Sequence, residues 1–310
     1  MKIHRNLKKF KAKNPVVTIG TFDGVHLGHR IVISRLQEIA SKYDGETVIF
    51  TFSPHPRLVT SPNETNLRLL TTLHEKIKLF EELGIDHLVI HPFTYEFSQL
   101  SYSDFVKNIL VDQIGTYCLV VGYDHKFGKN REGGFEYLRN CAQKYKFKVE
   151  KLEALSLGNA HISSTKIRMA LQEGDIAKAN RFLGYKFTLE GKVIEGKRIG
   201  RKMGFPTANI ESSDPHKIIP AHGVYAVNIV LNGKNYSGML NIGTRPTFNQ
   251  NADNRSIEVH IFDFEGDIYN AEIKLTFISK IRDEKKFDGI ESLVNQLKKD
   301  KIAAIELLKN

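Results

Sequence analysis

The stretch that decides the fold is residues 16–29, Val16-Val17-Thr18-Ile19-Gly20-Thr21-Phe22-Asp23-Gly24-Val25-His26-Leu27-Gly28-His29. It begins with a β-branched, mostly apolar run, which is typical of a buried strand in a parallel sheet. Two glycines and an aspartate then break the strand. An amphipathic helix is predicted from His26 to about Ala40, with Ile31, Leu36 and Ile39 near one face. A strand, a glycine turn and a helix N-terminus together predict an anion site, because unpaired N–H groups and the helix dipole point at one spot.

The same turn carries two histidines three residues apart, His26 and His29, with Gly28 between them. This spacing places both imidazoles on one face of the helix, where they can donate to phosphate oxygens. Zinc binding is the alternative, but the sequence has no nearby cysteine cluster and no His-Glu-x-x-His pattern. A P-loop is excluded, since no Gly-Lys-Ser or Gly-Lys-Thr follows. Two surface histidines at a helix start remain the plainer interpretation of the pair alone.

Length and composition indicate an ordinary globular protein. A chain of 310 residues has room for two domains with separate cores. It has no run of 18 apolar residues and no apolar signal core, so no membrane association is expected. Cys118 and Cys141 form no metal or redox pattern and favour a reducing cytoplasm. The net charge of +10 permits nucleic-acid binding but equally suits an enzyme acting on polyphosphates, and the basic runs lack base-stacking aromatics.

Strands alternate with helices as far as residue 184. Strands are predicted at residues 46–52, 86–90 and 118–122, and helices at 73–83 and 103–110. This alternation predicts an α/β domain with a doubly wound parallel sheet, whose ligands bind at the carboxyl ends of the strands. His55, flanked by two prolines in a rigid turn, and residues 122–128 follow two of these strands. A simple loop explains the prolines equally well.

A further helix begins after Ser164 and Thr165 and ends at Gly174. Its hydroxyl groups, N–H groups and Arg168 could hold a second phosphate, although simple capping explains the hydroxyls as well.

From about residue 185 the pattern changes to short strands. They are predicted at residues 188–194, 223–231, 234–242, 257–262 and 268–280, with a final helix from about Gly289. Asn232-Gly233 is a strong two-residue hairpin signal. The pattern predicts a small closed antiparallel β-barrel with a C-terminal helix. We therefore divide the chain into residues 1–184 and 185–310.

The barrel's candidate site starts in a basic, glycine-rich loop, residues 196–209. Its backbone can wrap phosphates, and Thr207 and Asn209 offer oxygen ligands suited to Mg²⁺. Such loops alone are weak evidence. Glu258 alternates with Ile257 and Val259, so on pattern alone it is a solvent-facing strand carboxylate.

Together, these motifs resemble the bacterial bifunctional riboflavin kinase/FMN adenylyltransferase family over nearly the whole chain. Residues 20–29 resemble its adenylyltransferase signature within the His-x-Gly-His nucleotidyltransferase superfamily, and residues 163–168 resemble its Ser-Ser-Thr-x-x-Arg motif. Residues 204–209 match its riboflavin kinase signature, Gly-Phe-Pro-Thr-Ala-Asn. Residues 122–128 resemble its Gly-x-Asp-Phe-x-Phe-Gly loop, except that His125 stands where the family usually has phenylalanine.

The resemblance implies a cytoplasmic enzyme with the small-molecule substrates riboflavin, FMN and ATP, and with no nucleic-acid or membrane partner. The barrel would phosphorylate riboflavin with MgATP to give FMN, and the α/β domain would transfer AMP from ATP to FMN to give FAD and pyrophosphate. Catalytic roles are implied for His26, His29, Arg168 and Glu258. ATP or phosphate contacts are implied for Gly20, Phe22, Asp23, Gly24, Gly28, Ser164, Thr165, Gly196, Arg201, Thr207 and Asn209, the last two also binding Mg²⁺. Flavin contacts are implied for His55, Asp124, Phe127, Gly128, Arg282 and Phe287.

The two reactions pose different chemical problems. The FMN phosphate is already anionic, so adenylyl transfer needs positioning and charge neutralisation. The ribityl hydroxyl is neutral, so a positioned base such as Glu258 should help. Three alternatives stay open: a kinase alone, if His125 weakens adenylylation; an RNA-binding barrel; and amino-acid activation, for which no anticodon-binding region is recognisable.

Overall fold

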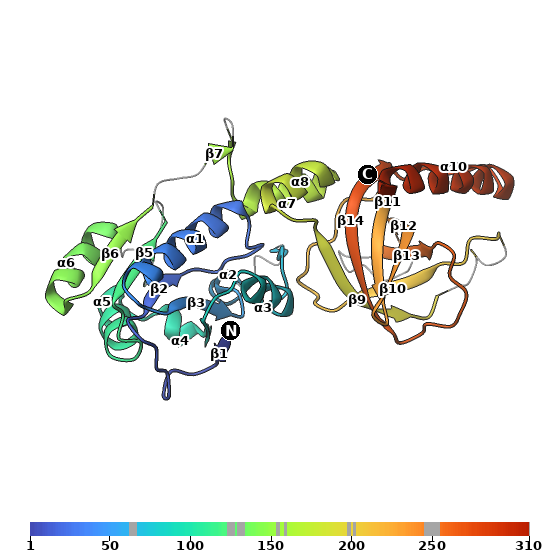
Figure 1. The fold of residues 1–310 in the computed structure, drawn as a ribbon. Helices are drawn as coiled ribbons and strands as arrows, with labels where there is room; N and C mark the ends of the chain where they lie inside the picture. The colour runs from blue at the N-terminus through green and yellow to red at the C-terminus, as the bar shows by residue number, and fades with distance from the viewer. Residues whose placement is uncertain are drawn as a thin grey trace. The chain divides into compact units, whose positions relative to one another are not determined.

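The computed structural model describes residues 1–61, 67–122, 128, 134–152, 156–157, 160–196, 200, 203–244 and 255–309. The chain divides into two compact units, Met1–Ser164 and Thr165–Asn310, which Figure 1 shows in blue to green and in yellow-green to red. The described helices include none long and apolar enough to cross a membrane.

The first unit is built on a six-stranded, all-parallel sheet in the order β1-β4-β3-β2-β5-β6. Strand β2 lies between β3 and β5, so the chain winds outward from β2 in both directions. The carboxyl end of β2 is therefore the topological switch point, where such sheets bind ligands. The strands are β1 Lys2–His4, β2 Val16–Ile19, β3 Thr47–Ser53, β4 His87–Pro92, β5 Cys118–Val121 and β6 Lys148–Lys151.

Helices cover both faces of this sheet, which confirms the predicted doubly wound arrangement. Leu119 and Val121 of β5 belong to one apolar cluster, whereas Cys118 and Val120 belong to another. Successive residues of a strand point to opposite faces, so the two clusters are the two sides of the sheet. The helical elements are α1 Leu27–Lys42, α2 Pro56–Thr60, α3 Leu73–Glu82, α4 Tyr95–Ser98, α5 Tyr102–Asp104, the π-helix η1 Phe105–Val111 and α6 Phe135–Tyr145.

One local prediction for this unit was wrong, one was incomplete, and two edge strands were missed. Ile31 is 40% exposed, because the buried stripe of α1 follows Ile33, Leu36 and Ile39, and a residue two positions before Ile33 lies on the opposite side of a helix. The helix expected over residues 103–110 is split into α5 and the π-helix η1. The edge strands β1 and β6 were not predicted, because they are short and rich in charged residues.

The second unit opens with two helices, α7 Ser164–Glu173 and α8 Ile176–Leu183. The Asp175 side chain caps α8 by accepting a hydrogen bond from the Lys178 N–H at 2.9 Å, and α8 ends at Gly184, whose φ is 78°. A small hairpin, β7 Ser156–Leu157 and β8 Ala160–His161, precedes α7 in the chain.

A closed antiparallel barrel follows, in the order β10-β13-β12-β11-β14-β9, with β9 paired to β10. This confirms the predicted barrel, including the Asn232-Gly233 hairpin turn, whose φ angles are 49° and 75°. Strand β10 was not predicted, because its first two residues, Ala208 and Asn209, belong to the motif of residues 204–209. The strands are β9 Thr188–Ile194, β10 Ala208–Ser212, β11 Gly223–Leu231, β12 Lys234–Thr244, β13 Arg255–Ile261 and β14 Glu272–Arg282.

The C-terminal helix α10, Ile290–Lys309, is fixed to the barrel by a buried ion pair. Arg282 Nε and Nη2 donate to the Asp300 carboxylate at 2.9 and 2.7 Å, and Asp300 is only 1% exposed. Gln296 Nε2 also donates to this carboxylate, at 2.8 Å. Breaking such a pair leaves one buried charge without compensation.

We therefore expect Asp300→Ala to lower the free energy of unfolding of the second unit by about 3 kcal/mol. Hydrogen exchange of the barrel amides in the full chain measures this loss separately from the first unit. The exposed Asp288→Ala is the matched control and should change protection little. Equal protection in both variants would show that the ion pair does not hold α10.

Candidate active sites

The histidine turn lies where the topology places a ligand site, between the end of β2 and the start of α1. Phe22, Gly24 and Val25 have φ angles of 48°, 85° and 36°. Only the glycine adopts such angles without strain, so neighbouring groups must hold the turn in this shape. A Cβ at Gly28 would lie 3.2 Å from the His26 ring, so a larger residue there would press on that ring.

The Asp23 carboxylate anchors this turn to the segment before α3. It is 2% exposed and accepts hydrogen bonds from the Leu70 N–H at 2.9 Å and the Thr71 N–H at 3.1 Å. The Gly24 N–H donates to Thr71 Oγ1 at 3.0 Å, and Ser164 Oγ donates to the Asp23 carbonyl at 2.9 Å. Asp23 and Ser164 therefore shape the turn, and their direct contact with phosphate stays a prediction.

The two imidazoles form a stacked pair at the start of α1. Their ring centroids are 3.7 Å apart with an interplanar angle of 15°, and Phe22 contacts His29 edge-on at 5.1 Å. His26 is the N-cap residue of α1, and its Nδ1 accepts from the His29 N–H at 3.4 Å. Burial lowers the pKa of His29 well below its usual value, and His26 and Lys76 lower it further. His29 is therefore a neutral hydrogen-bond donor at pH 7.

The structure places some of the other residues predicted for this site and leaves others outside the described ranges. His55 caps the short helix α2, where its Nδ1 accepts from the Arg57 N–H at 3.2 Å. Gly128 has a φ of 72° and packs so closely that a Cβ would lie 2.7 Å from the Tyr102 backbone. Thr165 and Arg168 lie on α7 in the second unit. Asp124, His125, Phe127 and Arg201 lie outside the described residues.

Aromatic rings gather at the ends of β3 and β4, a feature that the motif search missed. Phe52 contacts Phe93 at 5.3 Å and Phe97 at 5.8 Å, and Phe97 contacts His91 at 4.4 Å between ring centroids. All four residues are partly buried. In the sequence, this cluster is visible only as aromatic residues at the end of each strand. The fold is needed to show that they lie together.

In the barrel, the predicted kinase residues meet on one face of three neighbouring strands. Glu258 of β13 is paired with Asn209 of β10 on one side and with Asn241 of β12 on the other. Thr207 Oγ1 donates to Glu258 Oε2 at 3.3 Å. The flanking Ile257 and Val259 are 3% and 0% exposed, so Glu258 points away from the barrel core. Hydroxyl and amide oxygens, such as those of Thr207 and Asn209, are of the kind that Mg²⁺ binds.

Backbone atoms crowd these side chains and fix their positions. A Cβ at Gly196 would lie 2.1 Å from Asn209 Nδ2, and a Cβ at Gly200 would lie 2.3 Å from the Phe205 carbonyl oxygen. His260 Nδ1 lies 2.8 Å from the Pro206 carbonyl oxygen, and burial lowers the pKa of His260. The neutral ring therefore donates to that carbonyl and holds the segment just before Thr207.

We expect Gly196→Ala to displace the Asn209 amide, because no methyl group fits at this distance. If Asn209 helps to hold MgATP, the KM for ATP in riboflavin phosphorylation should rise by about tenfold, the effect of losing one good hydrogen bond to a charged group. Steady-state kinetics measure this change. Gly289→Ala, which meets no neighbouring atom within 4 Å and has no left-handed backbone angle, serves as the control for a glycine change in the second unit.

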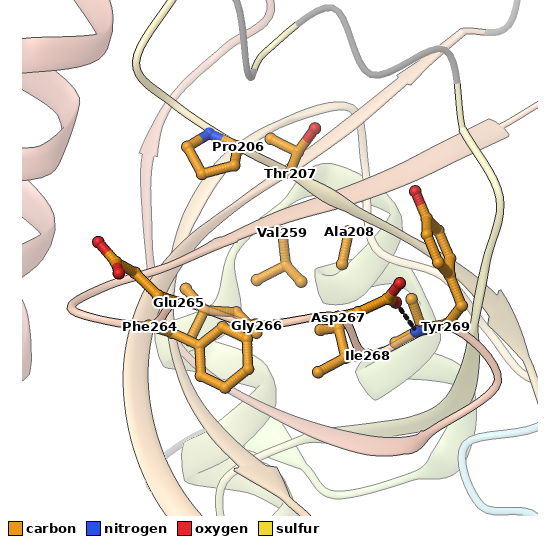
Figure 2. Close-up of a pocket in the computed structure, with 12 residues that line it drawn as sticks. Pro206, Thr207, Ala208, Val259, Phe264, Glu265, Gly266, Asp267, Ile268 and Tyr269 are labelled. Atoms are coloured by element: carbon orange, nitrogen blue, oxygen red, sulfur yellow. Dashed lines mark hydrogen bonds between the residues drawn. The ribbon is translucent and has the colours of Figure 1, made fainter.

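A pocket of about 310 Å³ opens beside Thr207. Figure 2 shows Ala208 and Val259 between the Pro206–Thr207 segment and the loop from Phe264 to Tyr269. The volume and the apolar lining, with Glu265 and Asp267 at the loop, are typical of a small-molecule site. The sequence reasoning placed Ile268 in a strand, whereas β14 begins at Glu272 and Ile268 lines the pocket.

Arg282 and Phe287, the predicted flavin contacts of the barrel, lie together. The Arg282 guanidinium carbon is 5.7 Å from the centre of the Phe287 ring. The guanidinium also binds Asp300, and its Nη1 donates to the Asp283 carbonyl at 2.9 Å. The structure thus gives Arg282 a role in holding α10, and its flavin contact stays a prediction.

Both sites offer groups suited to phosphate chemistry. The first has imidazole N–H groups and a helix N-terminus at a sheet's switch point, and the second has oxygen ligands and a carboxylate beside an apolar pocket. Such groups stabilise charge in phosphoryl and nucleotidyl transfer. This chemistry places the chain among the nucleotide-dependent transferases.

Comparisons with known proteins narrow that class. The FAD synthetase family model matches residues 8–166, and the riboflavin kinase family model matches residues 183–308. Bifunctional riboflavin kinase/FMN adenylyltransferases from Listeria monocytogenes, Bacillus subtilis and Escherichia coli K12 are 40%, 38% and 35% identical to the chain. These matches cover 93%, 99% and 97% of this chain and 90%, 96% and 95% of the relatives. The chain belongs to the bifunctional riboflavin kinase/FMN adenylyltransferase family.

One solved structure shares the whole fold. It is described as a macrolide-efflux protein from Streptococcus pneumoniae, and it matches with a TM-score of 0.87 and 29% identity over 98% of both chains. The family models and the full-length relatives show that this chain carries both enzymatic domains of its family.

Proposed function

We propose that the barrel phosphorylates riboflavin with MgATP and that the first unit transfers AMP from ATP to the resulting FMN. The pairing of Glu258 with Thr207 and Asn209 carries this proposal, because it sets a candidate base beside oxygen ligands. Family membership supports the choice of flavin substrates. We place the domain boundary at residues 184/185, after α8, and the reactions in the cytoplasm with no nucleic-acid or membrane partner.

In the kinase step, Glu258 accepts the proton of the terminal ribityl hydroxyl as its oxygen attacks the γ-phosphorus of ATP. The bond from the γ-phosphorus to the leaving ADP oxygen breaks at the same time. Thr207 and Asn209 would hold Mg²⁺ with the ATP phosphates, and the ion would neutralise their charge. The pocket beside Thr207 is where we place the adenine ring, since its apolar lining suits a flat heterocycle.

In the adenylyl-transfer step, no base is needed because the FMN phosphate is already anionic. His26 and His29 donate hydrogen bonds to the triphosphate as charge grows on the α-phosphate and on leaving pyrophosphate. The α1 N-terminus adds its dipole to the same end. We place the isoalloxazine ring against the aromatic residues Phe52, Phe93 and Phe97, which offer faces and edges for stacking.

One experiment tests both steps. The protein is incubated with riboflavin and MgATP, and the products are separated by chromatography. We expect FMN first and FAD later, with ADP and pyrophosphate as coproducts. If FMN accumulates and supplied FMN gives no FAD, the chain is a kinase alone, which is the outcome that the His125 departure would explain. Absence of both products would reject the proposal.

A further inference from the structure

The buried lysine Lys76 lies behind the histidine turn, with its ammonium group directed at the backbone of that turn. Lys76 belongs to α3, is 7% exposed, and donates from Nζ to the Thr21 carbonyl oxygen at 2.7 Å. Burial lowers the pKa of Lys76, and the Asp23 carboxylate acts in the opposite direction. Lysines are rarely buried to this degree unless they are paired, so this position calls for a specific reason.

Lys76 completes a set of contacts through which α3 and its leading segment hold the strained turn. The Asp23 carboxylate is bound by the N–H groups of Leu70 and Thr71, and Lys76 holds the carbonyl just before Phe22. These contacts reach both sides of Phe22, where φ is 48°. The positions of the two imidazoles therefore depend on α3 as well as on their own helix.

The charge of Lys76 also affects the protonation of the His29 ring. His29 Nδ1 is buried and has no hydrogen-bond partner among the described residues. Orphaned buried N–H groups are rarer than under-satisfied acceptors, so the proton of the neutral ring belongs on Nε2. Burial, then His26, then Lys76 lower the pKa of His29.

The other charged groups around the turn have partners of their own. The Asp23 carboxylate is bound by backbone N–H groups, and the Glu75 carboxylate accepts from the Thr72 N–H at 2.8 Å. Arg30 of α1 donates from Nε to the Val25 carbonyl at 3.3 Å. Among these groups, Lys76 is the cation that acts on the His29 ring.

We propose that Lys76 is a positioning residue for adenylyl transfer, which fixes the Thr21 carbonyl and places a buried positive charge at the histidine turn. This inference rests on the proposed function of the first unit. Lys76 itself is too buried to reach a substrate, so it acts through the turn and through His29. The Nε2–H group of the neutral ring then donates a hydrogen bond to a triphosphate oxygen.

Three variants of the full chain test this role. Lys76→Met removes both the charge and the hydrogen bond, whereas Lys76→Gln keeps a donor for the Thr21 carbonyl and removes only the charge. Lys78→Met changes an exposed lysine of the same helix and is the matched control. NMR titration of the histidine C2 protons measures the protonation of His29. The His29 signal is assigned as the one that disappears in His29→Ala. FAD formation from FMN and MgATP follows the reaction.

We expect the His29 titration to move to higher pH in both Lys76 variants and to stay in place in Lys78→Met. The kcat/KM for FAD formation should fall by about 10- to 100-fold in Lys76→Met, as for loss of a charged hydrogen bond. Riboflavin phosphorylation on the same chain should be unchanged.

A folded Lys76→Gln whose His29 titrates as in the parent protein overturns the proposal, whatever happens to activity, since Lys76 would then be structural support only. Unchanged FAD formation in Lys76→Met overturns it too. If Lys76→Met does not fold, Lys76→Gln decides. If the parent protein makes no FAD, the proposed function fails, while the titration still tests the effect of Lys76 on His29.

Discussion

Glu258→Gln is expected to slow FMN formation by at least about 10²-fold while FAD formation from supplied FMN continues. Glutamine has nearly the same shape and can still accept the Thr207 hydroxyl hydrogen bond, which is 3.3 Å long in this structure. It cannot take the proton of the ribityl hydroxyl. General-base catalysis contributes about 10²- to 10⁴-fold, so kcat for riboflavin phosphorylation should fall by that factor with little change in the KM for ATP.

Chromatography of the products, with riboflavin or FMN as the starting flavin, measures both activities. Glu272→Gln is the matched control, because Glu272 is an exposed strand carboxylate of the same barrel. It should leave both rates within about twofold, as expected for a surface change. Near-normal phosphorylation by Glu258→Gln would remove Glu258 as the base. Loss of both activities in a folded variant would contradict separate sites.

The prediction of this site depended on local patterns that happen to meet in space. Alternation in residues 257–259 placed Glu258 on the face opposite the core, and the motif of residues 204–209 supplied Thr207 and Asn209. What the pattern could not give was the register that sets Asn209 beside Glu258. Strand pairing is decided by contacts between residues distant in sequence. The sequence therefore predicted Glu258, Thr207 and Asn209 individually, but not that they lie side by side.

The residues whose roles the structure changes have partners far along the chain. The Asp23 carboxylate binds N–H groups 47 and 48 positions away, and Arg282 binds Asp300, 18 positions away. A motif shows the charged residue but not the groups that neutralise it. The pocket loop of residues 264–269 was missed for a related reason, since apolar residues after a strand do not reveal which surface they cover.

The sheet itself was easier to predict than its edges. The central strands β2, β3, β4 and β5 are apolar runs buried on both faces, and periodicity detects such runs directly. Strand β6 has the sequence Lys-Val-Glu-Lys and is partly exposed at the sheet edge. It is a strand because β5 offers it hydrogen-bonding partners, which is tertiary information.

His29→Ala should give the reverse phenotype of Glu258→Gln. Riboflavin is still phosphorylated, so FMN accumulates, while FAD formation falls by about 10²- to 10³-fold, the usual effect of removing one donor that stabilises developing charge. We expect this loss because of the ring geometry. The centroid of the His29 ring lies 3.7 Å from that of His26, on which it stacks, and 5.1 Å from that of Phe22, which it contacts edge-on. Removing it takes away a phosphate donor and a neighbour that orients the second donor.

Rates of FAD formation from FMN and MgATP, compared with riboflavin phosphorylation on the same preparation, measure the effect. His74→Ala removes an exposed imidazole of α3 and should change neither rate. Circular dichroism confirms that the variant folds, which matters because the ring also fills space beside Phe22. A folded His29→Ala that makes FAD at the parental rate would show that the histidine pair does not carry adenylyl transfer. The anion site at the β2–α1 turn would then depend on the backbone N–H groups of α1 alone.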